Sequence, residues 1–591
     1  MKNYVFDFAW GSTKFSAENP RKNVETRVFL THDPDLKGHQ KTKERWNENV
    51  HLYYSDDFYK TEKIALDAGN SIIMTNHYMF VAKAVSASTV KIHVSRAEMA
   101  FLDFKQARLP SNYQFTDHFT VLDTNEKTVF LYVSDHTKMN PVGNLFISDG
   151  MGYRFSHSLE NIIKQKHNVD FEAVESMEGT FLANRYDIQH RTGSFNTEGQ
   201  LKKLDDEELR AIEDAKTERS KMQNSGVVNK KQMQTSQGYK EELDSYLSKI
   251  KSYITHDKGA NWYLLKPPEV YMDGTKTNCY FENEECSLHI QMYSHKTESF
   301  APPYSSEQAI GVVLATGNLG PNVQFDANSR KSTFLSRDGG LNWQEIAKTP
   351  LIYDLGDQGG LIVAAPNTIS TKEVRYSWDE GKTWTKLRVS DQLIYVQNII
   401  AEPKCTSQQF VIYGAYDNST EEDEGEYDVE KKFGEALMIT LDFAQLHEKK
   451  CVGHSTPGRD DSDFELWSPH DDERHHLSQD GCLLGKKVTY VRRKQDSQCY
   501  NDFEQQPETK YVKHYRSSIP CVCTINDYEC DMNYVRNAGG ACEHIADPTG
   551  KITDWEKYDR EKDCENEGWY YKNQGYRKIP GDECHNGVQY D

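Results

Sequence analysis

Three aspartates in a repeated motif are the first residues of this chain that could do chemistry. Asp257, Asp338 and Asp379 each follow a Ser or Thr by two residues and precede a Gly by two and a Trp by five. Carboxylates are the groups that acid–base catalysis and glycoside cleavage use. The spacing favours a turn instead, because Asp bonds to nearby backbone N–H groups, Gly supplies a positive φ and Trp packs under the hairpin. We therefore predict that these aspartates are structural and not catalytic.

The twelve cysteines are the second candidate for chemistry, and they are unevenly spread. None precedes Cys279, Cys405 is isolated, and nine fall in residues 451–584. Dense cysteines in a small region indicate a module held by disulfides in an oxidising compartment. The alternative is a zinc site, but Cys521 and Cys523 form a C-x-C and no paired H-x₃₋₅-H accompanies them. We therefore expect neither a metal nor another cofactor.

Short antiparallel strands are the elements that must position the repeated turns. Weaker copies of the turn occur at Tyr54–Phe58 and Ser148–Gly152, and Ile92–Ser95 keeps the strand and the Ser. Aromatic and β-branched residues dominate these windows, as strands prefer. Six repeated turns, spaced for blades of four short strands, predict an all-β Asp-box β-propeller with six visible blades.

The chain is long enough to hold more than one domain. Its 591 residues exceed what one core organises. We place a partial propeller at residues 1–445 and a disulfide-rich module at residues 446–591. Residues 192–245 interrupt the strand pattern with a helical pattern and then a polar stretch, so we predict a protruding insertion there.

Composition and local signals bound the partners and the compartment. The net charge of -21 argues against nucleic acid and against anionic membrane surfaces. The sequence has no run of about 18 apolar residues, and its N-terminus lacks the apolar core of a signal peptide. Asn418 begins the one N-glycosylation sequon, which predicts a surface loop in a secreted chain.

Segments of the cysteine module resemble the Vps10/sortilin family. Asp480–Arg492 and Gly575–Cys584 are similar to two parts of that family's ten-cysteine module, and Cys521–Cys523 and Asp527–Asp531 are similar to its middle. The resemblance covers most of the chain outside residues 192–245. It implies a ten-bladed propeller followed by the ten-cysteine module. It also implies a luminal receptor that sorts protein cargo between the Golgi, endosomes and the cell surface, or to secretory granules and lysosomes.

The resemblance also implies how the cysteines pair. The implied bridges are Cys279–Cys286, Cys451–Cys499, Cys482–Cys521, Cys523–Cys584 and Cys530–Cys542. Cys564 would pair with a tenth module cysteine that this sequence does not contain.

A peptide-binding site in the propeller follows from the same resemblance. The family's pocket would fall near Phe80, Phe119 and Val121. The family holds a peptide's C-terminal carboxylate with an Arg, but the matching position here is Val90, with Lys91 beside it. An ammonium pairs with a carboxylate without the bidentate contact of a guanidinium. We therefore take Phe80, Lys91, Phe119 and Val121 as the candidate ligand-binding residues, with peptide or protein cargo as the partner.

Only six blades are visible where the family has ten. An open propeller exposes sheet edges and an apolar flank. We therefore expect a second chain or a further N-terminal segment to complete the ring, with a disulfide to Cys405 as one means of attachment. We expect membrane attachment only through a segment outside this chain.

Three functions remain open at this point. The first is a non-enzymatic receptor ectodomain, and the second is a structural subunit of a larger assembly derived from such a receptor. The third is a sialidase-like glycoside hydrolase, because Asp-boxes are frequent in sialidases. The sialidase F/Y-R-I-P signature is missing near the N-terminus, and the sequence shows no Ser-His-Asp arrangement, HExxH motif or P-loop. We therefore favour the receptor on the luminal or extracellular side and expect no enzyme activity.

Overall fold

The computed structural model of this chain is all-β, with short 3₁₀ turns between strands. The residues that the structure describes are 5–11, 24, 26–34, 46–86, 89–110, 119–123, 128–134, 142–165, 168–187, 250–281, 285–292, 301–325, 329–419, 433–447, 449–469, 481–501, 515–537, 540–544 and 575–590. The insertion that we predict at residues 192–245 lies outside them. Within the described residues, we find no helix with the length and hydrophobicity that a membrane crossing needs.

Two four-stranded antiparallel sheets begin the fold. The first holds β1 (Val5–Trp10), β2 (Val28–His32), β3 (His51–Ser55) and β4 (Lys63–Leu66). The second holds β5 (Gly69–Met74), β6 (Tyr78–Ser86), β7 (Thr89–Arg96) and β8 (Lys105–Gln106), with the 3₁₀ turn η2 (Ala97–Met99) before β8.

The next nine strands form one sheet that consists of two units. The first unit holds β9 (Phe119–Asp123), β10 (Phe130–Ser134), β11 (Val142–Ser148) and β12 (Phe155–Gln165). The second holds β14 (Phe171–Ala173), β15 (Phe181–Tyr186), β16 (Ile250–Thr255) and β17 (Tyr263–Leu264), and β13 (Asn168–Val169) pairs with the end of β12. The two units share a single residue pair, Ile162 with Arg185.

Three further sheets follow. The first holds β18 (Ser287–Ile290), β19 (Tyr304–Ser305), β20 (Val313–Gly320), β21 (Ser332–Ser336) and β22 (Gln344–Ala347). The second holds β23 (Leu351–Gly356), β24 (Leu361–Pro366), β25 (Glu373–Ser377) and β26 (Thr385–Arg388), with the 3₁₀ turn η5 (Asp357–Gly359). The third holds β27 (Ile394–Ile400), β28 (Gln409–Asp417) and β29 (Phe433–Asp442).

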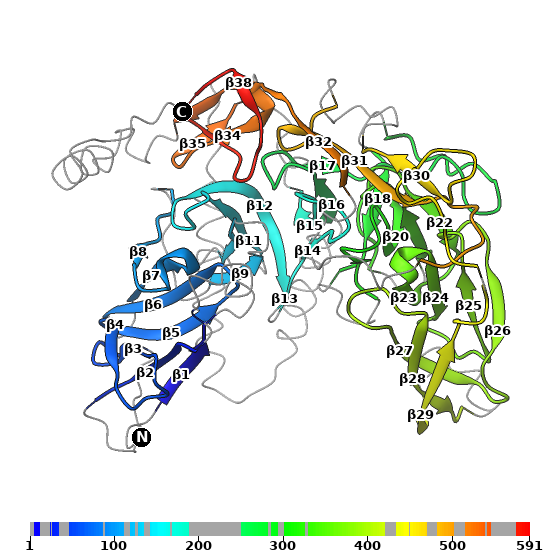
Figure 1. Cartoon of the computed structure of the whole chain (residues 1–591), viewed down its shortest axis with the longest axis horizontal. Coiled ribbons are helices and arrows are strands. Elements are labelled where there is room, and N and C mark those ends of the chain that lie inside the picture. Colours follow the sequence, from blue (N-terminus) through cyan, green and yellow to red (C-terminus); the bar gives the residue numbers. More distant parts are fainter. Residues whose placement is uncertain are drawn as a thin grey trace, which may run out of the picture.

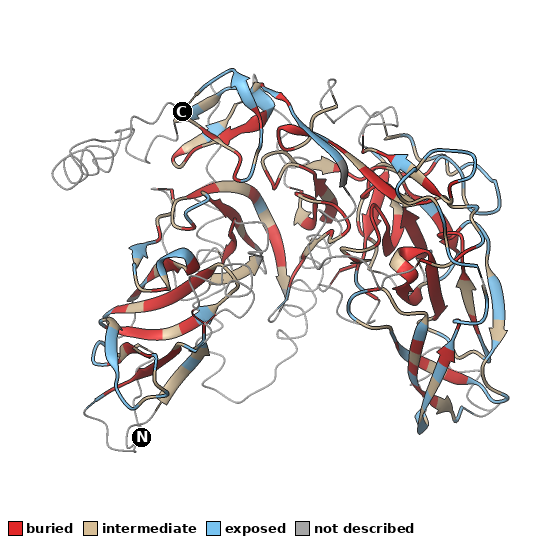
Figure 2. Ribbon diagram, in the orientation of Figure 1, coloured by how far each residue is buried: buried red, intermediate tan, exposed pale blue. Residues whose placement is uncertain are grey.

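These seven units lie side by side in an arc, with β1 at one end and β29 at the other (Figure 1). A buried apolar cluster lies between each unit and the next. The buried residues accordingly run along the middle of the sheets (Figure 2). Sheets that pack face to face around an arc are the blades of a β-propeller. The described part has one blade more than the six turns in the sequence, because β27–β29 carries no Asp-box.

The repeated motif forms the turn that its spacing predicts. The Ser336 hydroxyl donates to Asp338 Oδ1 (2.9 Å) and accepts from Gly340 N (2.9 Å). Asp338 Oδ1 also accepts from Asn342 N (2.8 Å), and the Trp343 indole donates to Gly340 O (2.9 Å). Gly340 has a φ of +89°, which explains why glycine stands there. The Asp338 carboxylate thus accepts hydrogen bonds from residues of its own turn, as a structural role requires.

The C-terminal module consists of small sheets. One has three strands, β30 (Phe464–Trp467), β31 (Lys486–Arg493) and β32 (Tyr515–Pro520). The others are pairs, β33 (Val522–Cys523) with β38 (His585–Gly587), β34 (Tyr528–Cys530) with β37 (Tyr576–Lys578), and β35 (Tyr534–Arg536) with β36 (Cys542–His544). The 3₁₀ turn η8 (Ile525–Asp527) precedes β34.

This module runs along one side of the arc and contacts blades that are far apart in the sequence (Figure 1). Arg577 of β37 donates to Ile147 O (2.8 Å) and Ser156 Oγ (2.7 Å) of the third blade. Lys258, in the Asp-box of the fourth blade, donates to Pro580 O (2.9 Å). Further along, Trp467 of β30 joins the apolar cluster of the fourth and fifth blades. The module therefore joins both halves of the arc.

Candidate functional site

Three of the four candidate ligand-binding residues lie in one apolar cluster between the second and third blades. Phe80 of β6 is 2% exposed, whereas Phe119 and Val121 of β9 are partly buried against the cluster. The two β9 residues pair with Val133 and Leu131 of β10. Phe80 therefore serves blade packing, and of the three only Phe119 and Val121 keep surface that a ligand could touch.

Lys91 does not belong to this cluster. It is exposed on β7 and stands opposite Lys83 of β6, while its neighbour Val90 is 3% exposed and points into the core. The alternation of a strand puts successive side chains on opposite faces, so burial of Val90 fixes Lys91 outside. Two ammonium groups on opposed positions of neighbouring strands form a cationic surface rather than a pocket.

A different lysine lies beside β9, and sequence reasoning missed it. Lys164, near the end of β12, donates to Thr120 Oγ1 (2.9 Å), and its ammonium lies 5.1 Å from the centre of the Tyr132 ring. Burial lowers the pKa of Lys164. Among the described residues no carboxylate forms an ion pair with it. No motif marks Lys164, because only the eleven-residue length of β12 lets its end reach across to β9.

The outer edge of β9 completes this group. Among the described residues, β9 pairs with β10 on one side and with no strand on the other. Its Phe119 and Val121 side chains point to one face, and Thr120, which holds the Lys164 ammonium, points to the other. An edge strand presents backbone N–H and C=O groups that an extended peptide can use. We name Phe119, Thr120, Val121 and Lys164 the β9 site.

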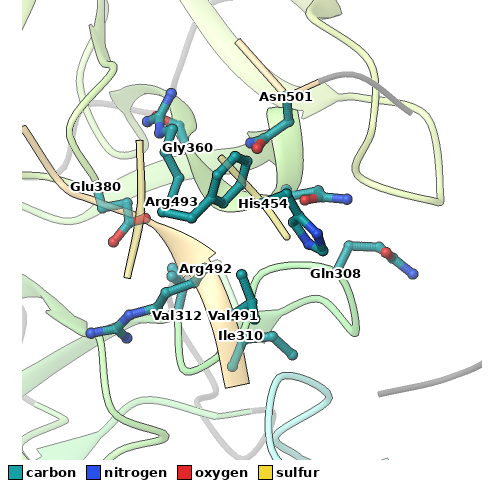
Figure 3. Close-up of a pocket in the computed structure, with 12 residues that line it drawn as sticks. Gln308, Ile310, Val312, Gly360, Glu380, His454, Val491, Arg492, Arg493 and Asn501 are labelled. Carbon is teal, nitrogen blue, oxygen red and sulfur yellow. The ribbon is translucent and has the colours of Figure 1, made fainter. Parts of the chain in front are cut away.

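A cavity elsewhere in the molecule is too small for cargo. It has a volume of about 20 Å³ and lies between the fifth and sixth blades and the module, lined by Ile310, Val312, Gly360, Glu380, His454 and Arg492 among others (Figure 3). Such a volume holds about one water molecule. The cavity is part of the interface between the propeller and the module.

The five disulfides are those that the resemblance implies. The bonded pairs are Cys279–Cys286, Cys451–Cys499, Cys482–Cys521, Cys523–Cys584 and Cys530–Cys542. Cys564 lies outside the described residues.

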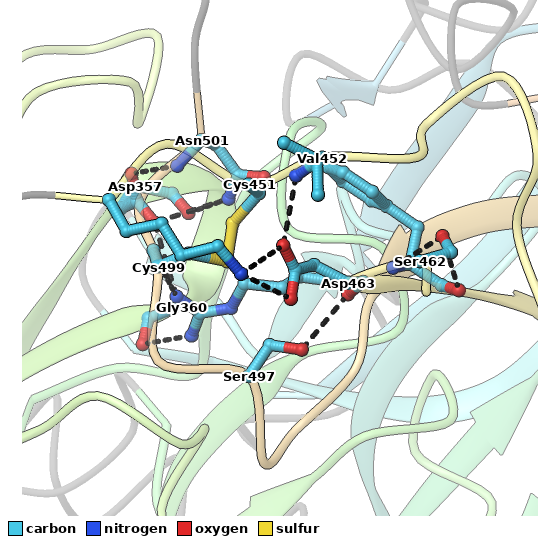
Figure 4. Close-up of a disulfide and its surroundings, with 12 residues drawn as sticks. Asp357, Gly360, Cys451, Val452, Ser462, Asp463, Ser497, Cys499 and Asn501 are labelled. Atoms are coloured by element: carbon cyan, nitrogen blue, oxygen red, sulfur yellow. Dashed lines mark hydrogen bonds and ion pairs between the residues drawn. A yellow bond between two sulfur atoms is a disulfide. The ribbon is translucent and has the colours of Figure 1, made fainter. Parts of the chain in front are cut away.

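The Cys451–Cys499 bridge shows how the module is tied to the propeller (Figure 4). Cys499 O accepts from Arg493 Nη1 (2.7 Å), and the same guanidinium donates to Gly360 O (3.0 Å) of the sixth blade. Asn501 N, two residues after the bridge, donates to Asp357 Oδ1 (3.0 Å). The disulfide thus holds the segment that follows β31 in place, and polar groups of this segment bond to the sixth blade.

The structure also shows the surroundings of Cys405 and Asn418. Cys405 is 1% exposed, and burial raises the pKa of its thiol to about 12. A buried thiol with a raised pKa is a poor nucleophile and does not face another chain, so this structure does not support the expected disulfide from Cys405 to a companion chain. Asn418 lies on the surface directly after β28, where a glycan would have room.

Two family models match this chain, one over its N-terminal part and one over its C-terminal part. The family model described as "Sortilin, neurotensin receptor 3" matches residues 1–205 and 220–399, and the model of its C-terminal part matches residues 401–591. The "Vacuolar protein sorting/targeting protein 10" of Coccidioides posadasii is 29% identical over 558 residues, which cover 92% of this chain and 32% of that protein. The protein of the same name from Laccaria bicolor is 26% identical over 598 residues, which cover 100% of this chain and 34% of that protein. The chain spans about a third of the length of these relatives.

Solved structures also match this chain, at low identity and low TM-score. The GH74 enzyme of Niastella koreensis matches with a TM-score of 0.28 and 9% identity, over 92% of this chain and 72% of that chain. The family models cover nearly the whole sequence, and that family comprises sorting receptors rather than enzymes. The chain therefore belongs to the Vps10/sortilin family of sorting receptors.

Proposed function

We propose that this chain is the luminal, cargo-binding part of a receptor that carries peptides or proteins between the Golgi, endosomes and a lytic or storage compartment. Its membership of a sorting-receptor family supports the class of function. Five disulfides support an oxidising, luminal environment. We keep residues 1–445 and 446–591 as the proposed propeller and module.

The β9 site is the observation that carries the proposal of cargo binding. A peptide strand along the outer edge of β9, which pairs with no strand among the described residues, would gain backbone hydrogen bonds, and Phe119 and Val121 would contact its side chains on one face. On the other face, Lys164 offers a partly desolvated ammonium without a carboxylate partner among the described residues. An acidic group of the cargo would supply that partner. The site therefore fits an extended segment that carries a carboxylate.

The test compares two lysines. Fluorescence anisotropy measures binding of an acidic peptide and of its amide-blocked, neutral counterpart to the intact chain. Lys164→Met should weaken binding of the acidic peptide about tenfold, equivalent to about 1.4 kcal/mol, and leave the neutral peptide unchanged. Lys91→Met is the matched control, because Lys91 is exposed and lies on β7, a strand of a different sheet from β9. Equal effects of both substitutions would show that only general positive charge matters.

A second candidate function, a subunit within a larger assembly, is supported by the two end faces of the arc. At one end Phe8 is 62% and Trp10 is 50% exposed, and at the other Tyr413 is 43% and Met438 is 73% exposed. Tyr413 and Met438 are paired on neighbouring strands, so they form one surface. Every inner blade buries the corresponding face against its neighbour. We propose that further β-sheets, from a second chain or another segment, cover both ends.

Native mass spectrometry of the protein isolated from its source tests this assembly. A stoichiometric partner chain, or a longer form of the same chain, supports covered ends. A monomer of this chain that remains soluble and unfolds cooperatively would show that the faces need no cover. Replacing Met438 and Trp10 by Glu should release a partner if one is present.

A further inference from the structure

Two carboxylates face each other inside the C-terminal module. Asp527 ends the turn η8, and Asp582 lies in the loop between β37 and β38. Asp527 is 7% exposed, and the side chain of Asp582 is fully buried. Oxygens of both carboxylates and the sulfur of Cys584 lie within 4.8 Å of one another. Like charges at this distance in a buried site repel each other strongly.

The hydrogen bonds of the two carboxylates show which of their oxygens lacks a donor. Asp582 Oδ1 accepts from Cys584 N (2.8 Å), and Asp527 Oδ2 accepts from Thr524 N (2.6 Å) and Thr524 Oγ1 (3.0 Å). Asp582 Oδ2 is buried and has no hydrogen-bond donor in the described part of the chain. Gly485 closes the site from another side, since a Cβ at that position would lie 2.2 Å from Asp582 Oδ1. The buried pair needs a proton or a cation between its members.

A proton fits this site better than a metal ion. Calcium takes six to eight oxygen ligands and magnesium about six. The site offers two carboxylates, one of which is already bonded by Thr524, and the third nearby atom, the sulfur of Cys584, belongs to a disulfide. Lys578 Nζ also lies 3.8 Å from Asp582 Oδ1, and its positive charge opposes a second cation.

The cations around the pair donate their hydrogen bonds to other acceptors. From β37, Lys578 donates to Cys584 O (2.7 Å). From β31, Lys486 bonds to Glu583 (2.7 Å) and to Glu178 of the propeller (3.0 Å). From the fourth blade, Lys258 donates to Pro580 O (2.9 Å).

The next strand pair of the module, β34 with β37, holds the buried ion pair of Glu529 and Arg577 (2.7 Å). None of these cations donates to Asp582 Oδ2. Burial, reinforced by the charge of Asp527, raises the pKa of Asp582 to about 7.

We propose that Asp527 and Asp582 share one proton when the module is docked, and that this proton-binding site tightens the loop of residues 579–584 onto the propeller as the medium becomes more acidic. The shared proton replaces repulsion with a hydrogen bond between the two side chains. The loop it steadies is the one that receives Lys258 through Pro580 O and Lys486 through Glu583.

The direction of the effect follows from linkage. A carboxyl whose folded pKa exceeds its unfolded value binds its proton more tightly in the folded state. Stability of the loop therefore rises as the pH falls from about 7 towards about 4, and it does not change with this pair above about 7. The receptor would hold its module more firmly in an acidic compartment than at neutral pH.

Hydrogen exchange of the full chain, followed by mass spectrometry between pH 5 and 7.5, tests the proposal. The reporters are the amides of Glu583 and His585, which bond to Leu484 O and Cys521 O. After correction for intrinsic exchange, the slope of the logarithm of the opening constant against pH counts the linked protons. We expect the slope to fall by about one in Asp582→Asn and equally in Asp527→Asn, a tenfold difference per pH unit. An amide supplies permanently the N–H that the shared proton supplies only below about pH 7.

Asp461→Asn is the control, because Asp461 is an exposed residue of the same module. Its slope should match that of the unsubstituted chain, and Glu529 contributes equally to all variants. Unchanged slopes in both Asn variants would overturn the proposal. It would also be overturned if calcium at pH 7.5 protected the loop and a chelator reversed this, because the site would then hold a cation. If one Asn variant fails to fold, the other still decides the question.

Discussion

The propeller and the C-terminal module are built from the same kinds of strand but are held together differently. Between the fifth, sixth and seventh blades, a large cluster of aliphatic and aromatic residues is buried, including Leu361, Ile362 and Val363. In the described part of the chain, the buried cluster of the module's last part consists of Cys523, Tyr528 and Cys584. A small unit cannot bury enough apolar surface to be stable alone. The module relies instead on disulfides and on buried polar contacts with the propeller.

The largest expected effect is the loss of Arg577. Arg577→Met leaves Glu529 as a buried, unpaired charge and removes the bonds to Ile147 O and Ser156 Oγ. Breaking a buried pair in this way costs about 3–5 kcal/mol. Limited proteolysis should cut the module while the propeller stays intact. Arg536→Met is the control, since the hydrogen bonds of Arg536 within the described residues go to two carbonyls of the module itself; equal damage from both would show that loss of docking is not the cause.

Removing a disulfide should destabilise the module more than it destabilises the propeller. Cys523→Ala with Cys584→Ala opens a bridge that spans 61 residues and should destabilise the module by about 2–4 kcal/mol. The Cys279–Cys286 bridge of the propeller spans only 7 residues, so its removal should cost less. Urea denaturation with separate reporters for the two regions measures both. A larger loss from the propeller bridge would contradict the division proposed above.

Acidification should act on the module through Glu529 as well. Burial, opposed by Arg577, raises the pKa of Glu529 to about 7, above its ordinary value of 4.5. Docking should therefore strengthen as the pH falls from about 7 to about 4.5, by at most about 1.4 kcal/mol per pH unit. Glu529→Gln should remove this part of the pH dependence in thermal unfolding, whereas Glu543→Gln, at an exposed position of β36, should not.

A smaller effect is expected within one Asp-box. Ser336→Ala removes the hydroxyl that accepts from Gly340 N and donates to Asp338. Each lost hydrogen bond in a buried turn costs about 1 kcal/mol, so we expect about 1–2 kcal/mol in chemical denaturation. Unchanged stability would mean that apolar packing alone shapes the blade turns.

The smallest effect should come from an exposed ion pair at the interface between the propeller and the module. Lys382 of the sixth blade bonds to Asp496 of the module (2.5 Å), but the two side chains are 53% and 79% exposed. Such pairs contribute about 0–1 kcal/mol. Lys382→Ala should leave the unfolding midpoint within error. A loss comparable to that of Arg577→Met would show that exposed charges hold the module.

The sequence predicts the local parts of this architecture well. The Asp-boxes could be recognised because one short segment contains every partner of the turn, from Ser336 to Trp343. The cysteine pairs followed from family resemblance. The seventh blade could not be counted because β27–β29 forms without that motif.

The candidate site was harder to predict, because it depends on distant segments. Phe119 and Val121 were found through resemblance, yet Lys164 reaches β9 from a strand that begins more than thirty residues later. Lys91 was selected as a neighbour of the family's cation, but the burial of Val90 turns it to the outside. Proximity across strands depends on twist and strand length, which a linear pattern does not contain.

The contacts of Arg577 and Lys258 also set an order of events during synthesis. Arg577 bonds to residues that precede it by 421 and 430 positions, and Pro580 receives a bond from a lysine 322 positions earlier. Long-range contacts of this kind form late, since the intervening chain must be made and ordered first. The third and fourth blades therefore keep unsatisfied surface until Arg577 and Pro580 have been made and the module has docked. A nascent chain that stops before Arg577 would leave that surface exposed to solvent, so docking of the module is the step that closes it.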